Sequence, residues 1–280
     1  MPMPDAGSLH RRTRDALGRI GVRPQRSLGQ NFLVSSPVVE RIVVAARATG
    51  RVVVEIGPGI GALSDALAAI ADELFLVEID ARMAERLAER FAAAPNVHVV
   101  AADALAVDYS KLLVGRRRAV AVGNLPYSVG SQILLRLIES RASFERLVLM
   151  LQREVAERLI AKPGTKAYGV LTLWTALYGE AEIVLRVSRG SFVPRPKVES
   201  AVVSVKLHTA PRVSIDDEKR FRAVVRAAFG QRRKTLRAAL AKIARTADIE
   251  RAGIDPRRRG ETLSLAEFAN LANLLGDPSR

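Results

Sequence analysis

The chain has 280 residues, of which 49% are hydrophobic and 26% charged, and its formal net charge is +15. This composition is typical of a globular protein, and no run reaches the roughly 18 unbroken apolar residues that a membrane helix needs. Because there is no cysteine, disulfides and thiolate metal sites are excluded, and without an apolar N-terminal run we expect a cytoplasmic protein.

The positive charge is concentrated at the two ends of the chain. Residues 1–51 carry 9 basic and 3 acidic side chains, residues 52–211 carry 19 and 17, and residues 212–280 carry 16 and 9. A nearly neutral middle between basic ends indicates a catalytic body whose flanks bind a polyanion such as nucleic acid. An arginine-rich composition that only favours solubility would give the same totals.

From Ser36 onward, helical and strand patterns alternate. Ser36 and Pro37 are typical of the N-cap and first position of a helix over residues 38–48. Further helices are predicted over 62–71, 81–93 and 131–140, and strands over 51–57, 73–80, 96–103, 117–123 and 145–152. Such alternation predicts a doubly wound α/β fold, with a parallel sheet covered by helices on both faces.

The second half of the chain predicts two helices, at 154–161 and 170–179, and then two strands, at 182–188 and 200–208. The short loop with prolines between these strands favours antiparallel pairing at the sheet edge. A proline and acidic caps interrupt the pattern at Thr209–Asp217, so we place the domain boundary between 1–210 and 211–280. Three helices, at 218–229, 231–244 and 265–275, predict an all-helical C-terminal domain.

Three glycines, Gly57, Gly59 and Gly61, lie between a predicted strand and a predicted helix. Glycine permits a tight turn and a close approach of the backbone to a ligand. The GxGxG spacing differs from the GxGxxG of dinucleotide-binding proteins, and Glu55 just before the loop disfavours a pyrophosphate. We therefore expect the three glycines to bind an uncharged or cationic cofactor.

Acidic residues follow the next two strands. Glu78 lies nineteen residues after Gly59, where a carboxylate accepts hydrogen bonds from a ribose diol. Asp103 ends the following strand, where it can accept a hydrogen bond from an adenine amino group. Together with the glycine loop these acids favour S-adenosylmethionine, a nucleoside with a sulfonium. The alternative, that the acids only cap helices, fits Asp80 better than the other two. Because the three histidines are scattered, no metal site is predicted.

The segment Asn124-Leu125-Pro126-Tyr127 lies where a strand gives way to a helix. The Asn124 side-chain carbonyl and the Leu125 backbone carbonyl can accept both protons of an adenine N6 amine, which localises its lone pair. Pro126 fixes the turn, and Tyr127 offers a face for stacking. A β-turn with a buried tyrosine is the competing interpretation.

A base inside a duplex cannot enter such a pocket, so the substrate must be unpaired, looped or flipped out. The loop from Ser191 to Ser200 offers Phe192 as a second stacking face, and Arg195 and Lys197 as phosphate ligands. Phe192 could equally be part of the core.

Six motifs, in order and over nearly the whole chain, resemble the small-subunit (16S) ribosomal RNA adenine N6,N6-dimethyltransferases. They are RSLGQNFL (26–33), EIGPGIGAL (55–63), VEID (77–80), NLPY (124–127), SFVPRPKVES (191–200) and FGQRRKTLR (229–237). The resemblance implies a Rossmann-like class I methyltransferase domain and a helical C-terminal domain. It also implies dimethylation of two adjacent adenosines in a hairpin near the rRNA 3′ end.

The resemblance also implies cofactor contacts by Asn31, Leu33, Gly57, Glu78 and Asp103. Asn124 would touch both cofactor and target amine, and Gln30 would help to close the pocket. The related large-subunit rRNA methyltransferases usually have lysine in the glycine loop and isoleucine in NxPY, whereas Ile60 and Leu125 stand here. Ser64 replaces the expected threonine and keeps a hydroxyl.

Two basic clusters are candidate RNA-binding sites. Helical spacing predicts that Arg232, Arg233, Lys234 and Arg237 share one helix, and a second cluster lies at 257–259. We expect the small ribosomal subunit as partner, no membrane and a monomer. A nicotinamide-dependent oxidoreductase, a non-catalytic rRNA assembly factor and a protein-amide methyltransferase are the rival interpretations.

Overall fold

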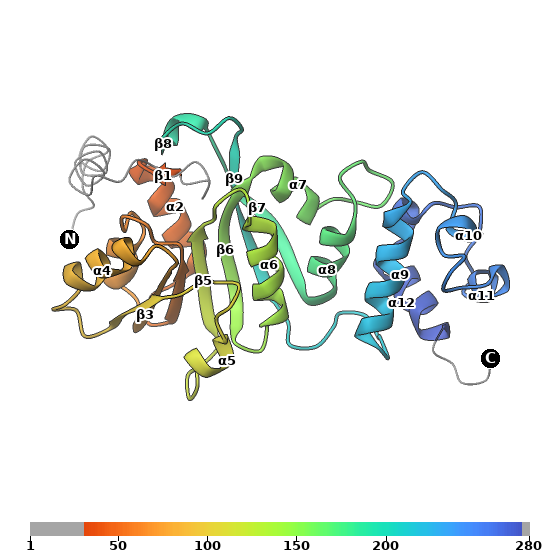
Figure 1. The fold of residues 1–280 in the computed structure, drawn as a ribbon, viewed down its shortest axis with the longest axis horizontal. Coiled ribbons are helices and arrows are strands. Elements are labelled where there is room, and N and C mark those ends of the chain that lie inside the picture. The colour runs from red at the N-terminus through yellow and green to blue at the C-terminus, as the bar shows by residue number, and fades with distance from the viewer. Residues whose placement is uncertain (1–30, 276–280) are drawn as a thin grey trace. The chain divides into compact units, whose positions relative to one another are not determined.

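The computed structural model describes residues 31–275, which divide into two compact units (Figure 1). The first unit contains the chain through Ala156 together with Ala181–Leu207, and the second contains Glu157–Glu180 and the chain from His208 onward. This division differs from the predicted boundary near residue 210, because Glu157–Glu180 belongs with the C-terminal helices. No helix among the described residues is long and apolar enough to cross a membrane.

A seven-stranded sheet forms the centre of the first unit, in the order β4-β3-β2-β5-β6-β9-β7. Its strands are β2 (Val52–Ile56), β3 (Glu73–Glu78), β4 (Val97–Ala101), β5 (Ala119–Asn124), β6 (Phe144–Gln152), β7 (Gly179–Val187) and β9 (Ser200–Leu207). The pairs β2-β3, β3-β4, β2-β5 and β5-β6 are parallel. The predicted α/β fold is confirmed, and parallel pairing brings the carboxyl ends of β2, β3, β4 and β5 to one edge.

Apart from the short helix over Tyr109–Leu112, which was not predicted, helices alternate with the strands as the sequence pattern predicted. They are α2 (Ser36–Ala46), α3 (Ser64–Ala68), α4 (Ala81–Arg90), α5 (Tyr109–Leu112) and α6 (Gly130–Glu139), with α7 (Arg153–Leu159) at the junction of the two units. Asp80 caps α4 by accepting the Arg82 backbone N–H. Ser36 is the first helical residue and Ser35 takes the N-cap, one position earlier than predicted. The β2 strand is buried along its whole length, as expected for a central parallel strand.

The two strands that were predicted to pair at the sheet edge, β7 and β9, are neighbours there, with β7 as the edge strand. On its other side β9 pairs antiparallel with β6. In the loop before it, η2 (Arg189–Ser191) leads into β8 (Phe192–Val193), which pairs with β1 (Phe32–Leu33). This two-stranded ribbon joins the start of the described chain to the loop that precedes β9.

The second unit is helical, as predicted. Its elements are α8 (Val170–Tyr178), α9 (Glu218–Gly230), α10 (Leu236–Ala239), α11 (Thr246–Arg251), η3 (Gly260–Thr262) and α12 (Leu265–Leu274). Aromatic contacts hold α8 to α9, since the Trp174 ring lies 6.4 Å from the Phe221 ring and 4.0 Å from the Arg222 guanidinium.

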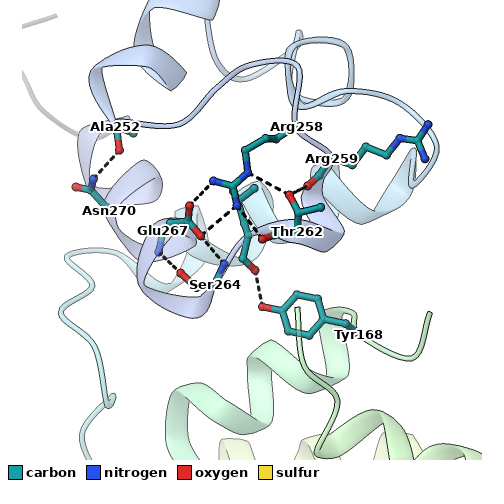
Figure 2. A network of polar contacts seen from close by, with 9 residues as sticks. Tyr168, Ala252, Arg258, Arg259, Thr262, Ser264, Glu267 and Asn270 are labelled. Atoms are coloured by element: carbon teal, nitrogen blue, oxygen red, sulfur yellow. Dashed lines mark hydrogen bonds and ion pairs between the residues drawn. The ribbon is translucent and has the colours of Figure 1, made fainter. Parts of the chain in front are cut away.

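The predicted helix over 231–244 is wrong, because only Leu236–Ala239 is helical. The backbone N–H groups of Leu236 and Arg237 donate to the carbonyls of Arg258 and Pro256. Figure 2 shows how Arg258 is held, with its guanidinium paired to Glu267 and donating to Thr262. Contacts with the 256–262 segment therefore override helical spacing in this stretch.

Candidate active site

The glycine loop after β2 requires glycine at three positions. Gly57, Gly59 and Gly61 have φ angles of 66°, 57° and 83°, a region that other residues rarely adopt. A side chain at Gly59 would also meet Phe32 at 3.2 Å, and one at Gly61 would meet Arg90 at 2.9 Å. The loop is thus held tightly between β1 and α4.

A cavity of about 230 Å³ opens at the edge where β2, β3 and β5 end. Most of the predicted site residues meet there, although they come from five separate parts of the sequence. Those that line it are Asn31, Leu33, Gly57, Gly59, Glu78, Asp103, Asn124, Leu125, Pro126 and Tyr127. Gly61 supports the loop but is not among the lining residues, and Gln30 lies outside the described residues.

Glu78 connects the cavity to the glycine loop. Its side chain is buried, with one oxygen accepting the Gly59 N–H at 2.8 Å and the other the Asp80 N–H at 2.9 Å. Burial raises the pKa of this carboxyl, and the two backbone N–H groups oppose the rise. A carboxylate oxygen has more than one lone pair, so Glu78 can still accept hydrogen bonds from a ligand diol.

Glu55 also lines the cavity. From the sequence it was expected only to disfavour a pyrophosphate at the glycine loop. Its side chain is 1% exposed, and Ser64 donates a hydrogen bond to it at 2.7 Å. Burial raises the pKa of Glu55 to about 8, with the charges of Glu78 and Asp65 adding to the effect. The hydroxyl retained at Ser64 therefore holds a buried acid at the floor of the glycine loop.

The remaining wall is apolar. Ile79, Met83 and Leu105 line the cavity, and the Asp103 carboxylate accepts the Leu105 N–H at 2.9 Å. Ile79 is 58% exposed even though it directly follows a buried strand. These three residues were not predicted from the sequence. The place of Ile79, an apolar residue directly after the acid that ends a strand, is the one signal that could have revealed it.

Asn124 is oriented by a contact from the start of the described chain. Its side-chain nitrogen donates to the backbone carbonyl of Asn31 at 2.8 Å. Because the nitrogen is used in this way, the side-chain oxygen remains to accept a hydrogen bond at the cavity. Leu33, two residues after Asn31, is fixed by the β1-β8 pairing.

The other members of the motif are anchored to the sheet. The Leu125 N–H donates to the Met150 carbonyl at 3.1 Å, while the Tyr127 hydroxyl forms a short hydrogen bond with the Ser200 hydroxyl. Burial raises the pKa of Tyr127, and this hydrogen bond opposes the rise. Leu125 is buried, whereas Asn124 and Tyr127 are partly exposed.

The Phe192 ring does not line the cavity, where it was predicted to stack on the target base. It is 3% exposed, belongs to the core cluster, pairs with Leu33 across the ribbon and is not among the cavity residues. A ring packed in this way offers no free face to a base, so its stacking role is corrected to core packing. Arg195 and Lys197, in the same loop, are exposed.

The predicted RNA-binding cations of the second unit differ in their surroundings. Arg232 donates to Glu261 at 2.7 Å and to the Thr165 carbonyl at 3.1 Å, so it holds local structure together. Arg258 is similarly engaged, whereas the Arg259 side chain points away from the network in Figure 2. The exposed members of the two clusters are Arg233, Lys234, Arg237, Arg257 and Arg259.

Comparison with known proteins decides the family. The family described as "Ribosomal RNA adenine dimethylase" matches residues 22–277 of this chain. The chain belongs to the ribosomal RNA adenine dimethylases. A relative from Geobacillus thermodenitrificans, named "Ribosomal RNA small subunit methyltransferase A", is 44% identical, and the match covers 94% of this chain and 95% of the relative. A relative of the same name from Moorella thermoacetica is also 44% identical, with coverage of 91% and 93%.

Solved structures agree with this membership. A dimethyladenosine transferase from Plasmodium falciparum matches with a TM-score of 0.68 and 25% identity, covering 86% of this chain and 95% of that one. The 23S rRNA methyltransferase ErmE matches with a TM-score of 0.67 and 27% identity, covering 88% and 100%. The predicted family, the class I methyltransferase fold and the enzyme class are confirmed for this ribosomal RNA adenine dimethylase.

Membership of the ribosomal RNA adenine dimethylases confirms the predicted cofactor, S-adenosylmethionine. The residues that line the cavity suit this cofactor. The Glu78 side chain can accept hydrogen bonds from a ribose diol, and the apolar wall matches a purine. Within the described part of the chain, no group of three or more acidic or histidine side chains is arranged to hold a metal ion.

Proposed function

We propose that this enzyme dimethylates the N6 amines of two adjacent adenosines in a hairpin near the 3′ end of small-subunit rRNA. The orientation of Asn124 by the Asn31 carbonyl is the observation that carries the proposal, because it leaves an amide oxygen as acceptor at the cavity. The relatives at 44% identity, which are named as small-subunit methyltransferases, support the choice of ribosomal subunit.

The residues of the site perform three tasks. Glu78 and the glycine loop bind the nucleoside of S-adenosylmethionine, which supplies an electrophilic methyl group when bound. The Asn124 side-chain oxygen and the Leu125 backbone carbonyl accept the two protons of the adenine amine, so its lone pair becomes available for in-line attack. Tyr127 stacks on the base and excludes water from one face. None of these tasks needs a strong base.

The exposed cations supply phosphate contacts in this proposal. Arg233, Lys234 and Arg237 lie in the second unit, and Arg195 and Lys197 lie beside β8 in the first. We infer that the first unit, with its basic N-terminal extension, transfers the methyl group, and that the helical second unit binds rRNA. Binding by cations to phosphates weakens steeply with salt. We also infer a cytoplasmic monomer that acts during ribosome biogenesis.

Two other functions predict different results. A non-catalytic assembly factor would bind the immature subunit through the same cations without methyl transfer. A large-subunit rRNA methyltransferase has structural support from the match to the 23S rRNA methyltransferase ErmE, but Ile60 in the glycine loop and Leu125 in the NLPY motif favour the small-subunit enzymes.

The test is transfer of labelled methyl from S-adenosylmethionine to small subunits that lack the modification, followed by nucleoside analysis. Dimethyladenosine at two adjacent positions is the expected result. Transfer to large-subunit rRNA alone would assign the enzyme to the other ribosomal subunit. Tight binding to the particle without transfer would favour the assembly factor.

A further inference from the structure

Ser200, to which the proposed function assigns no role, contacts Tyr127 of the NLPY segment. It is the first residue of β9, it is completely buried, and its hydroxyl bonds to the hydroxyl of Tyr127, 73 residues away in the sequence. This contact joins the end of the SFVPRPKVES motif to the tyrosine that lines the cavity.

The other anchors of the segment do not hold the tyrosine ring. The Leu125 N–H and the Asn124 side chain bind the Met150 and Asn31 carbonyls, and both contacts lie before Tyr127 in the chain. A tyrosine ring swings about its Cα–Cβ bond, which carries the distal hydroxyl through a wide arc. Fixing that hydroxyl therefore stops the swing, and a partly buried tyrosine hydroxyl needs such a partner.

We propose that Ser200 is a positioning residue for methyl transfer, because it holds the Tyr127 ring where its face stacks on the target adenine. This inference rests on the proposed function of the site. Stacking fixes the direction of the amine relative to the Asn124 oxygen, and small errors in such alignment reduce the reaction rate strongly. The cofactor is held mainly by other residues, so its affinity should change little.

A simple structural role for Ser200 predicts a different pattern, and β9 offers a matched control. Ser204 is also a buried serine on this strand, and it accepts a hydrogen bond from Arg146 at 3.1 Å. Neither Ser204 nor Arg146 lines the cavity. Replacement of Ser204 by alanine thus removes the same hydroxyl from the same strand without touching Tyr127.

The experiment measures kcat, the KM and Kd for S-adenosylmethionine and the Tm of four full-length variants on unmodified small subunits. The variants are Ser200→Ala, Tyr127→Phe, the double variant and Ser204→Ala. We expect kcat to fall about tenfold in each of the first two, with no further loss in the double variant, since both remove one bond. Kd should stay within about twofold, and Ser204→Ala should keep the wild-type kcat.

Equal kcat values for Ser200→Ala and Ser204→Ala would overturn the inference, as would additive losses in the double variant. If Ser200→Ala does not fold, Tyr127→Phe decides alone, because it removes the same bond but keeps the ring, and a wild-type kcat would then overturn the inference. A wild-type enzyme without any methyl transfer would instead reject the proposed function, and this inference with it.

Discussion

The side-chain nitrogen of Asn124 and the backbone carbonyl oxygen of Asn31 are joined by a 2.8 Å hydrogen bond between groups 93 residues apart. The bond connects the end of β5 to the residue just before β1. An amide offers its nitrogen as donor and its oxygen as acceptor, so this contact decides which end remains for the substrate. The orientation of the Asn124 amide at the end of β5 therefore depends on Asn31, at the start of the described chain.

Replacement of Asn124 by alanine should abolish most turnover while RNA binding persists. The loss removes one of the two acceptors for the amine protons, and we expect kcat to fall on the order of 100-fold. Single-turnover methyl transfer measures the chemical step, and filter binding to unmodified subunits measures affinity. Asn96→Ala is a matched control, because Asn96 also donates to backbone carbonyls, those of Ala68 and Ala71, but does not line the cavity.

Asn124→Asp tests the orientation itself. An aspartate has no N–H to donate, and it would place a carboxylate oxygen against the Asn31 carbonyl. We expect a loss of kcat comparable to that of the alanine variant, although an acceptor oxygen is retained. Transfer at the wild-type rate by either variant would show that the assignment of the amine pocket is wrong.

Replacement of Glu78 by glutamine should weaken cofactor binding more than it slows chemistry. The glutamine keeps the volume but loses one of the two oxygens that accept the Gly59 and Asp80 N–H groups and a ligand diol. We expect the Kd for S-adenosylmethionine to rise on the order of tenfold, measured by calorimetry. RNA affinity should not change, and an unchanged cofactor Kd would remove Glu78 from the binding site.

Much of the site could be predicted because its residues stand at strand ends. Glu78 and Asn124 are the last residues of β3 and β5, and the parallel order of these strands brings them to one edge. Hydrophobic runs reveal the strands, and the alternation with helices reveals that they are parallel. The local pattern therefore determined the arrangement of these side chains.

The features that were missed depend on contacts between distant segments. β1 and β8 have two residues each, too short for any periodicity, so the burial of Phe192 in their ribbon left no local signal. The apolar spacing of 231–244 is helical, yet Arg232 is bound by Glu261 and Thr165, and the backbone turns before Leu236. Tertiary contacts override propensity at both places.

The buried Glu55 should make stability depend on pH. Its pKa is raised from 4.5 to about 8 in the folded state, mainly by burial, so folding favours the protonated form. A group of this kind stabilises the fold fully below pH 4.5, and this stabilisation is lost as the pH rises through about 8. Burial also raises the pKa of the neighbouring Glu78, which adds to the trend.

Comparison with Glu55→Gln isolates the contribution of Glu55, because the amide cannot ionise and can still accept the Ser64 hydrogen bond. The free energy of unfolding of the wild type should fall relative to this variant between pH 4.5 and 8, as measured by urea titration at several pH values. Parallel pH profiles for the two proteins would mean that Glu55 is not protonated by folding in this range.

The adjacent arginines Arg232 and Arg233 should have separable effects. Arg232 binds Glu261 and the Thr165 carbonyl, so Arg232→Ala should lower the stability of the second unit, by about 1 kcal/mol for the lost contacts. Arg233 and the next residue, Lys234, are exposed, so their double alanine variant should keep the wild-type Tm.

The same double variant should bind unmodified small subunits more weakly and with a flatter salt dependence. Log K falls as log salt rises, and each lost phosphate contact makes this slope less negative by about 0.7 to 0.9. Lys111→Ala, which removes one exposed cation in the first unit, shows the effect of losing a positive charge elsewhere and should leave this slope unchanged. If Arg232→Ala flattens the slope without lowering Tm, then Arg232 contacts RNA and its bond to Glu261 contributes little to stability.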